Sequence, residues 1–290
     1  MDQRIIDLYD SFTHGSISRR EFLDRAAGLV GSAVAAAALL PLLQNDYALA
    51  AFVAENDPRL VAEMASFDSP SGKISGYLVR PKEKGERPAV LVIHENRGIN
   101  PHIKDVARRL ATEGYLAYAV DLLSPLGGTP DDEEKGRELY GKLNRTDTTV
   151  TTAAVSFLKK HPESTGKVGA VGFCAGGEML NQLAAASPEL DAAAVYYGRA
   201  VSADKVPGIK AALLLHYAEN DAGVNATVPA FEEALKANNK KYTKHQYPGT
   251  QHSFNNDTGG ARYHKEAADL AWGRTLAFFK ENLGAPPKAS

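Results

Sequence analysis

The feature that most constrains this chain is a five-residue turn around its only cysteine, Cys174. Residues 172–176 read Gly-Phe-Cys-Ala-Gly and directly follow an apolar run, residues 168–171, that predicts a buried strand. Glycine on both sides of the cysteine allows a sharp turn from strand to helix, because a side chain at either position would clash inside the turn. Such a turn presents the sulfur at the carboxyl end of a sheet and makes the amide of Ala175 available to an oxyanion. The motif therefore predicts a strand–turn–helix unit that carries a nucleophile.

Strand and helix patterns alternate along the rest of the chain. The apolar run at residues 89–93 is typical of a central strand that is covered on both faces. Further strands are predicted at residues 73–79, 115–120, 192–197, 211–216 and 242–247. Helices are predicted at 103–111, 175–185, 228–237 and 262–283, and two more lie within 131–160. Because strands that alternate with helices pair in parallel, we expect a mostly parallel sheet with helices on both faces. With the turn at Cys174, this order is typical of the α/β-hydrolase fold.

The length and charge of the chain narrow the classes of function. Its 290 residues, of which 44% are hydrophobic, suit one large α/β domain with an appendage. A formal net charge of −2 gives no reason to expect nucleic acid as a partner. The sequence has neither a zinc-type Cys/His spacing nor a glycine-rich phosphate loop, so we expect no metal and no cofactor. We predict a targeting or helical segment at residues 1–50, a polar connector at 51–70 and the α/β-hydrolase domain at 71–290.

The first 50 residues resemble a twin-arginine export signal. Residues 18–23 read Ser-Arg-Arg-Glu-Phe-Leu, an uncharged stretch rich in Ala, Gly and Leu follows at 26–43, and Ala-Leu-Ala at 48–50 suits a signal peptidase. The pattern predicts export to the periplasm by the twin-arginine (Tat) machinery. Three other interpretations stay open: an uncleaved membrane anchor, a helical hairpin that includes an amphipathic helix at 1–12, and a vestigial motif in a cytoplasmic enzyme.

Two polar side chains follow later strands at positions that suit a catalytic triad. The strand predicted at 211–216 ends shortly before Asp221, and the next predicted strand ends shortly before His252. In α/β-hydrolases the nucleophile, the acid and the histidine occur in this order at the carboxyl ends of strands. His252 would then hold the proton of the Cys174 thiol, and Asp221 would orient the imidazole and stabilise its charged form. Glu219 is a competing acid, although we expect it to be a solvated loop carboxylate.

The loop after the central strand at 89–93 is predicted to complete the site. We expect the backbone amide of Asn96 to be the second oxyanion donor. Glu95 stands at the end of a buried strand, where a carboxylate needs a partner. In one interpretation Glu95 pairs with Arg97 or another arginine, and in the other it contacts the Cys174 thiol.

Taken together, these residues resemble the dienelactone hydrolase family, the carboxymethylenebutenolidases. The resemblance covers roughly residues 70–285. It rests on the cysteine turn, the Glu95 loop, Tyr-Tyr-Gly at 196–198, Asp221 and His-Ser-Phe at 252–254.

The resemblance implies a cofactor-free hydrolase of small esters or lactones. Its triad would be Cys174, His252 and Asp221, and the amides of Asn96 and Ala175 would form the oxyanion hole. It also implies that Glu95 holds the resting thiol and that substrate binding releases the thiolate.

The chain departs from the family where arginines usually bind the carboxylate of the substrate. One such arginine follows the His-Ser-Phe segment, where this chain has Asn255 and Asn256, and another follows Asp121, where it has Leu-Leu-Ser at 122–124. Candidate replacements are Arg97, Arg199 and Arg262, and the residues predicted to contact the substrate are Arg97, Tyr197 and Phe254. We therefore expect the family's chemistry with a different substrate.

Two further functions remain as alternatives. The protein could be a diverged carboxylesterase for neutral substrates, or a non-hydrolytic protein that binds a ligand or senses redox state through the Cys174 thiolate. We favour the hydrolase because a binding protein needs neither His252 nor Asp221.

Overall fold

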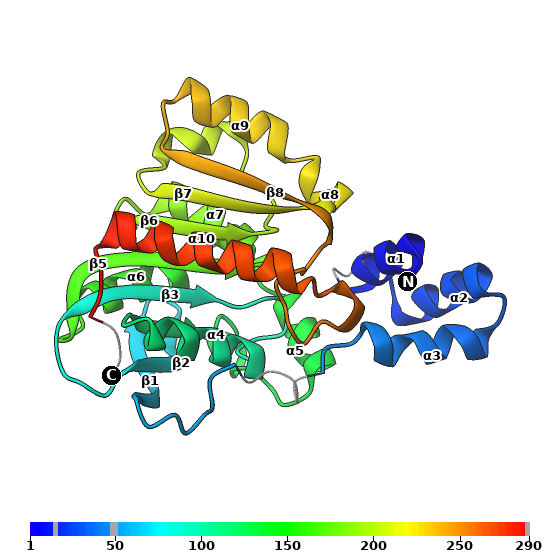
Figure 1. Ribbon diagram of the computed structural model, residues 1–290, viewed down its shortest axis with the longest axis horizontal. Coiled ribbons are helices and arrows are strands. Elements are labelled where there is room, and N and C mark those ends of the chain that lie inside the picture. The colour runs from blue at the N-terminus through cyan, green and yellow to red at the C-terminus, as the bar shows by residue number, and fades with distance from the viewer. Residues whose placement is uncertain (14–16, 47–51, 288–290) are drawn as a thin grey trace.

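The computed structural model describes residues 1–13, 17–46 and 52–287, and one eight-stranded sheet runs through it (Figure 1). The strands are β1 (Leu60–Ser69), β2 (Gly72–Pro81), β3 (Arg87–Ile93), β4 (Leu116–Val120), β5 (Ser164–Phe173), β6 (Ala192–Tyr196), β7 (Ala212–Asn220) and β8 (Tyr242–Gln251). Their order in the sheet is β1-β2-β4-β3-β5-β6-β7-β8. β2 is antiparallel to both of its neighbours, and all other neighbours are parallel. The mostly parallel sheet of an α/β-hydrolase is therefore confirmed.

Helices cover both faces of the sheet. α4 (Pro101–Thr112) and α10 (Lys265–Leu283) lie on one face, and α6 (Thr149–Lys159) and α7 (Ala175–Ala186) lie on the other (Figure 1). Every residue of β3, β4 and β6 is buried, because neither face of these strands is open to water. The shorter helices are α5 (Glu133–Tyr140), α8 (Ala222–Asn225) and α9 (Val228–Ala237).

The polar connector predicted at residues 51–70 is wrong in its second half. β1 occupies this part of the chain and pairs with β2 along its whole length, from Leu60 opposite Pro81 to Ser69 opposite Gly72. The polar turn at residues 70–71 connects two strands of a hairpin. The sequence conceals β1 because it is an edge strand whose residues are all exposed or half-buried, so it lacks the apolar run of the central strands.

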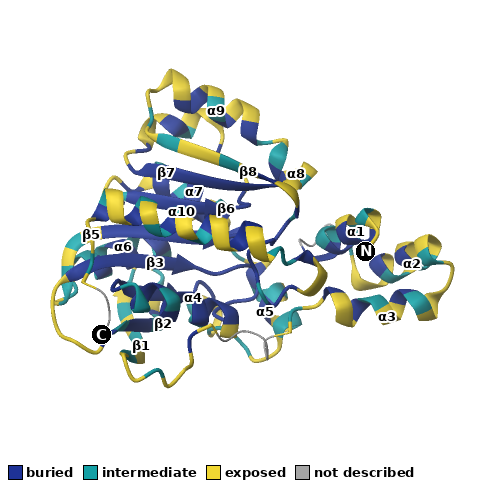
Figure 2. Ribbon diagram, in the orientation of Figure 1, coloured by how far each residue is buried: buried dark blue, intermediate teal, exposed yellow. Residues whose placement is uncertain are grey.

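Three helices precede the sheet: α1 (Gln3–Thr13), α2 (Arg19–Val30) and α3 (Ala33–Leu43). Together with residues 44–46 they form the N-terminal segment, which lies beyond the carboxyl ends of the parallel strands (Figure 1). The three helices share a hydrophobic core of their own, made by Ile5, Ile6, Tyr9, Phe12, Phe22, Ala26, Ala36, Leu40 and Leu43. Their outer faces are largely exposed (Figure 2).

Within the described ranges, no individual helix has the length and apolar composition of a membrane span. α2 and α3 meet that criterion only jointly, and the chain bends by 113° between them. The predicted signal-peptidase residues 48–50 lie outside the described residues.

Candidate active site

The turn around Cys174 has a strained backbone that its two glycines make possible. Cys174 joins β5 to α7 with φ 54° and ψ −117°, a combination that residues other than glycine rarely adopt. A Cβ at Gly172 would lie 2.3 Å from the carbonyl oxygen of Gly176. A Cβ at Gly176 would lie 2.4 Å from two carbonyl oxygens at the end of β3. The predicted strand–turn–helix unit thus packs directly under the loop that carries Glu95 and Asn96.

This packing makes Gly176 sensitive to the smallest enlargement. We expect Gly176→Ala to lower the free energy of unfolding by about 1–3 kcal/mol, because the new methyl group meets backbone atoms rather than flexible side chains. The matched control is Gly273→Ala in α10, where a Cβ meets nothing within 4 Å. That control should be neutral or stabilising by up to about 1 kcal/mol, since alanine is the better helix former. Urea unfolding of both variants tests this, and equal stability of the two would contradict it.

The structure places Asp221, and not Glu219, beside His252. Oδ2 of Asp221 lies 2.6 Å from Nδ1 of His252, which directly follows β8. Glu219 is exposed, and its carboxylate accepts a hydrogen bond of 2.8 Å from the amide of Gly249. Asp221 therefore occupies the position of the acid that orients an imidazole.

The environment of His252 favours its protonated form. Burial by itself would lower the pKa of this imidazole, which is only 3% exposed. The charge of Asp221, the charge of Cys174 and hydrogen bonds to both outweigh burial and raise the pKa of His252 well above its ordinary value. An imidazolium next to a cysteine stabilises the thiolate, which is the nucleophilic form of the side chain.

Cys174 and His252 line a cavity of about 560 Å³, the main cavity. Asn96 and Ala175, the two residues predicted to form the oxyanion hole, both line it. In the described part of the chain, neither backbone amide donates a hydrogen bond to another protein group. Both amides are therefore available to an oxygen atom that is bound in the cavity.

Glu95 is a buried carboxylate with one unsatisfied oxygen. Its Oε2 accepts a hydrogen bond of 3.0 Å from the side-chain amide of Asn256, whereas its buried Oε1 has no hydrogen-bond partner among the described residues. Glu95 lines a small cavity together with Cys174 and His252. The chain thus places a carboxylate in the same small cavity as the cysteine. A neutral amide, Asn256, binds one of its oxygens at a position where the family was expected to have an arginine.

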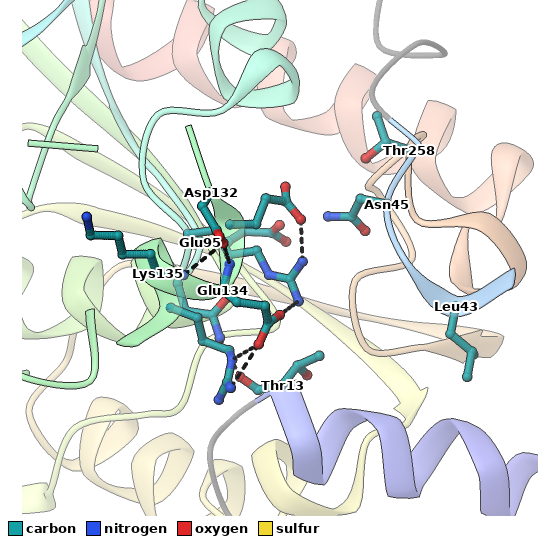
Figure 3. Close-up of polar contacts among 12 residues, drawn as sticks. Thr13, Leu43, Asn45, Glu95, Asp132, Glu134, Lys135 and Thr258 are labelled. Carbon is teal, nitrogen blue, oxygen red and sulfur yellow. Dashed lines mark hydrogen bonds and ion pairs between the residues drawn. The ribbon is translucent and has the colours of Figure 1, made fainter. Parts of the chain in front are cut away.

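Arg97 forms ion pairs with α5. Its Nη1 lies 2.6 Å from Glu133, and its Nη2 lies 3.8 Å from Glu134. Glu134 also pairs with Arg137, which lines the main cavity (Figure 3). Arg97 itself is 7% exposed and lines the small cavity with Cys174.

The two aromatic residues that were predicted to contact the substrate lie at different depths. Tyr197 lines the main cavity, and its ring centroid is 5.0 Å from that of His252. Burial, followed by the negative charges of Glu95 and Cys174, raises the pKa of Tyr197 well above its ordinary value, so its hydroxyl remains a neutral donor. Phe254 is completely buried and packs against Tyr197, with ring centroids 5.6 Å apart. Phe254 therefore supports the wall of the cavity from behind.

Sequence reasoning missed several residues of the cavity. Thr13, Arg137, Arg145 and Tyr140 line it, and they come from α1, α5 and the loop after α5. None of these residues follows a strand of the sheet, which is the signal that identified Asp221 and His252. Arg199, one of the candidate replacements for the family's arginines, lines the cavity as well.

Comparison with known families and proteins identifies the family of this chain. Residues 74–283 match the model of the dienelactone hydrolase family, and residues 1–30 match a model described as YqhI-like. A putative carboxymethylenebutenolidase of Saccharolobus solfataricus is 32% identical over 251 residues, which cover 74% of this chain and 96% of that protein. A putative carboxymethylenebutenolidase of Escherichia coli K12 is 31% identical over 244 residues, which cover 79% of this chain and 90% of that protein.

Solved structures extend the similarity to the fold. A putative dienelactone hydrolase from Klebsiella pneumoniae is 32% identical with a TM-score of 0.68, and the match covers 77% of this chain and 99% of that one. A dienelactone hydrolase-like promiscuous phosphotriesterase from metagenomic libraries is 25% identical with a TM-score of 0.69, and the match covers 78% of this chain and 100% of that one. The family model and the curated relatives cover most of the chain, and the chain therefore belongs to the dienelactone hydrolase family.

Proposed function

We propose that this protein is a cofactor-free hydrolase of small carboxylic esters or lactones and that Cys174, His252 and Asp221 form its catalytic triad. The observation that carries the proposal is the 2.6 Å contact between Asp221 and His252 at the cavity that contains Cys174. Ester or lactone hydrolysis is also supported by the relatives from S. solfataricus and E. coli, which are both named putative carboxymethylenebutenolidases.

The proposed reaction has two steps. The Sγ thiolate of Cys174 attacks the carbonyl carbon of the ester, and the carbonyl electrons move to the oxygen, which the amides of Asn96 and Ala175 bind. The tetrahedral intermediate collapses to a thioester, and the departing oxygen takes the proton from Nε2 of His252. His252 then removes a proton from water, the hydroxide attacks the thioester, and collapse releases the carboxylic acid and restores the thiolate.

Glu95 is proposed to hold the cysteine before substrate binds. Its buried Oε1 lacks a partner among the described residues, so a Cys174 thiol proton would satisfy it. Substrate that enters the cavity would displace this contact, and the thiol proton would pass to His252, which is already hydrogen-bonded to Cys174. Asn256 keeps Glu95 in position through its 3.0 Å hydrogen bond and adds no positive charge.

Arg199 is the candidate for binding a carboxylate of the substrate. It lines the main cavity together with Cys174, and it forms no ion pair within the described residues. Arg262, another candidate, is instead bound by the N-terminal segment. We therefore expect lactones that carry a carboxylate to be preferred over neutral esters.

The experiment that tests the proposal is to trap the thioester. The protein is incubated with a panel of neutral esters, neutral lactones and carboxylate-bearing lactones, quenched with acid during turnover, and analysed by mass spectrometry of the peptide that contains Cys174. An acyl group on Cys174 is the expected result.

Arg199→Ala should raise the KM of the carboxylate-bearing lactones only. If the variant still prefers these lactones, Arg199 does not bind the carboxylate of the substrate. If nothing in the panel turns over while Cys174 still reacts rapidly with iodoacetamide, the thiol-sensing alternative replaces the hydrolase.

Export of the protein by the twin-arginine machinery stays a prediction. Its check is the N-terminal residue of the protein recovered from the periplasm of the cells that produce it.

A further inference from the structure

Both ends of α1 contact loops of the active site. At its beginning, the side chain of Gln3 donates a hydrogen bond of 2.6 Å to the side chain of Gln251, the residue that precedes His252. At its end, the carbonyl oxygen of Thr13 accepts a hydrogen bond of 2.7 Å from the side-chain amide of Asn96. α1 therefore bridges the loop that carries the histidine and the loop that carries the oxyanion donor.

The buried guanidinium of Arg262 contacts several parts of the N-terminal segment. Its Nη2 donates to Oδ1 of Asn45 at 3.0 Å and to the carbonyl oxygen of Leu43 at 3.4 Å. The same guanidinium lies 5.2 Å from the ring centroid of Tyr9 and 3.9 Å from a carboxylate oxygen of Asp10. Arg262 is only 6% exposed, and a buried guanidinium that loses its partners is strongly destabilising. The segment is thus docked by specific polar contacts.

Figure 3 shows the same docking from the side of the active site. Asn45 of the N-terminal segment lies beside Thr258, which follows the histidine loop. The amide of Asp46 donates to the carbonyl oxygen of Thr258 at 2.8 Å. Segments that are about 200 residues apart in the sequence therefore meet, and Asn45 and Arg262 from these segments line the small cavity with Cys174.

The twin-arginine-like motif has a structural role in this segment. Ser18 caps the beginning of α2 in a capping box with Glu21, each bonding the backbone amide of the other. Phe22 is completely buried, with its ring centroid 5.8 Å from that of Tyr9 and 5.7 Å from that of Phe12. The serine, the glutamate and the aromatic residue of the motif are thus used to fold the three helices.

The docked segment forms part of the cavity walls. Thr13 lines the main cavity with Cys174 and His252, and Thr13 and Asn45 line the small cavity with Glu95. The ring of Phe12 lies 4.9 Å from the guanidinium of Arg137, which is itself a residue of the main cavity. Without the segment, the cavity would lose one of its sides.

We propose that the N-terminal segment is a cap that sets the size of the acyl group accepted at Cys174. It would act by closing one side of the cavity at Thr13 and by holding the Asn96 loop in place through the hydrogen bond between Thr13 and Asn96. The inference rests on the proposed hydrolase function for its effect on esters, whereas its effect on access to Cys174 stands independently. It requires residues 1–46 to remain attached in the active protein.

The test loosens the cap from within, by Phe22→Ala in the full chain. Phe22 contacts the core of the segment and none of the catalytic residues, so its loss should unfold the helices while the sheet remains intact. The matched control is Val34→Ala, which shortens an apolar side chain of the same segment that is 82% exposed. Limited proteolysis within residues 1–46 verifies that the cap has opened in the first variant only.

Two readouts follow the access to Cys174. Because Cys174 is the only cysteine of the chain, the rates of its reaction with iodoacetamide and with a bulky maleimide report on small and large molecules directly. We expect the ratio of the bulky to the small rate to rise at least about tenfold in Phe22→Ala, and the ratio of kcat/KM for long-chain and short-chain p-nitrophenyl esters to rise likewise. The kcat for the short ester should fall several-fold, since the Asn96 loop loses its support.

The outcomes separate this inference from the proposed function. If no ester is hydrolysed but the alkylation ratio rises, the hydrolase proposal fails and the cap stands. Unchanged ratios in a variant whose cap is cut by protease would overturn the cap, as would active protein recovered from cells without residues 1–46. If Phe22→Ala does not fold, a protease site placed at residues 47–51 of the wild-type chain allows the segment to be cut off after folding. A rise in the alkylation and kcat/KM ratios after cleavage would then support the cap, and unchanged ratios would overturn it.

Discussion

Replacement of Cys174 by alanine is expected to reduce ester hydrolysis to the uncatalysed background, a loss of at least about 10⁴-fold in kcat. Cys174 is the only cysteine in the chain, and the proposed mechanism has no other nucleophile at the turn between β5 and α7. Without the sulfur, no thioester forms, and the oxyanion amides can only polarise the substrate for attack by water. The measurement is the initial rate on the best ester or lactone of the panel, with the background rate subtracted.

The control for this variant is its stability. The side chain of Cys174 is 7% exposed and small, so its truncation should change the free energy of unfolding by no more than about 1 kcal/mol. Thermal unfolding at the same midpoint would show that the lost activity reflects chemistry and not folding. Turnover at the wild-type rate in a folded Cys174→Ala protein would rule out the cysteine as the nucleophile.

The second large effect is expected for Asp221→Asn, which should lower kcat by about 10³–10⁴-fold. The carboxylate of Asp221 accepts a hydrogen bond from the N–H at Nδ1 of His252, and its charge contributes to the raised pKa of the imidazole. The side-chain amide of asparagine would lack this charge and would permit the tautomer of His252 with its proton on Nε2. The other oxygen of Asp221 accepts from the amide of Val224 at the start of α8, a contact that asparagine can retain. Rates of ester hydrolysis and of Cys174 alkylation should therefore fall together, at unchanged stability.

Glu219→Gln is the matched control for Asp221→Asn. It removes the same charge two residues earlier, from an exposed carboxylate that bonds the amide of Gly249. We expect its kcat to stay within about twofold of the wild type, because surface substitutions of this kind have small effects. A large loss in Glu219→Gln together with a small loss in Asp221→Asn would reverse the assignment of the acid.

The arrangement of Cys174, Asp221 and His252 could be predicted because each position follows from a local rule. The glycines at 172 and 176 leave room for only one kind of turn at Cys174, and the apolar runs of the central strands show where the parallel sheet lies. In a parallel sheet the carboxyl ends of all strands meet at one edge, so Asp221 and His252 had to approach the cysteine once their strands were identified.

Other features depended on contacts that no local pattern encodes. β1 reads as a polar connector because an edge strand needs no continuous apolar run. In the sequence, Asn256 stands out only because the family usually has an arginine near this position. Its hydrogen bond to Glu95 joins residues that are 161 positions apart, so no local pattern predicts it. Arg137 and Arg145 line the main cavity from α5 and the loop that follows it. Neither residue follows a strand, so the sequence pattern did not identify them.

The sequence by itself determined the fold class and the positions of Cys174, Asp221 and His252 along the sheet, because steric limits on a turn and the pairing of parallel strands act on any chain with these residues. The tertiary structure alone showed where the described residues among the first 46 pack. An uncharged, alanine-rich stretch after Arg-Arg-Glu-Phe-Leu suits an export signal and a packed helix equally well, since both need short apolar side chains. The burial of Phe22 packs the helices of the N-terminal segment together, and the contacts of Thr13 with Asn96 and of Asn45 with Arg262 place the segment against the active site.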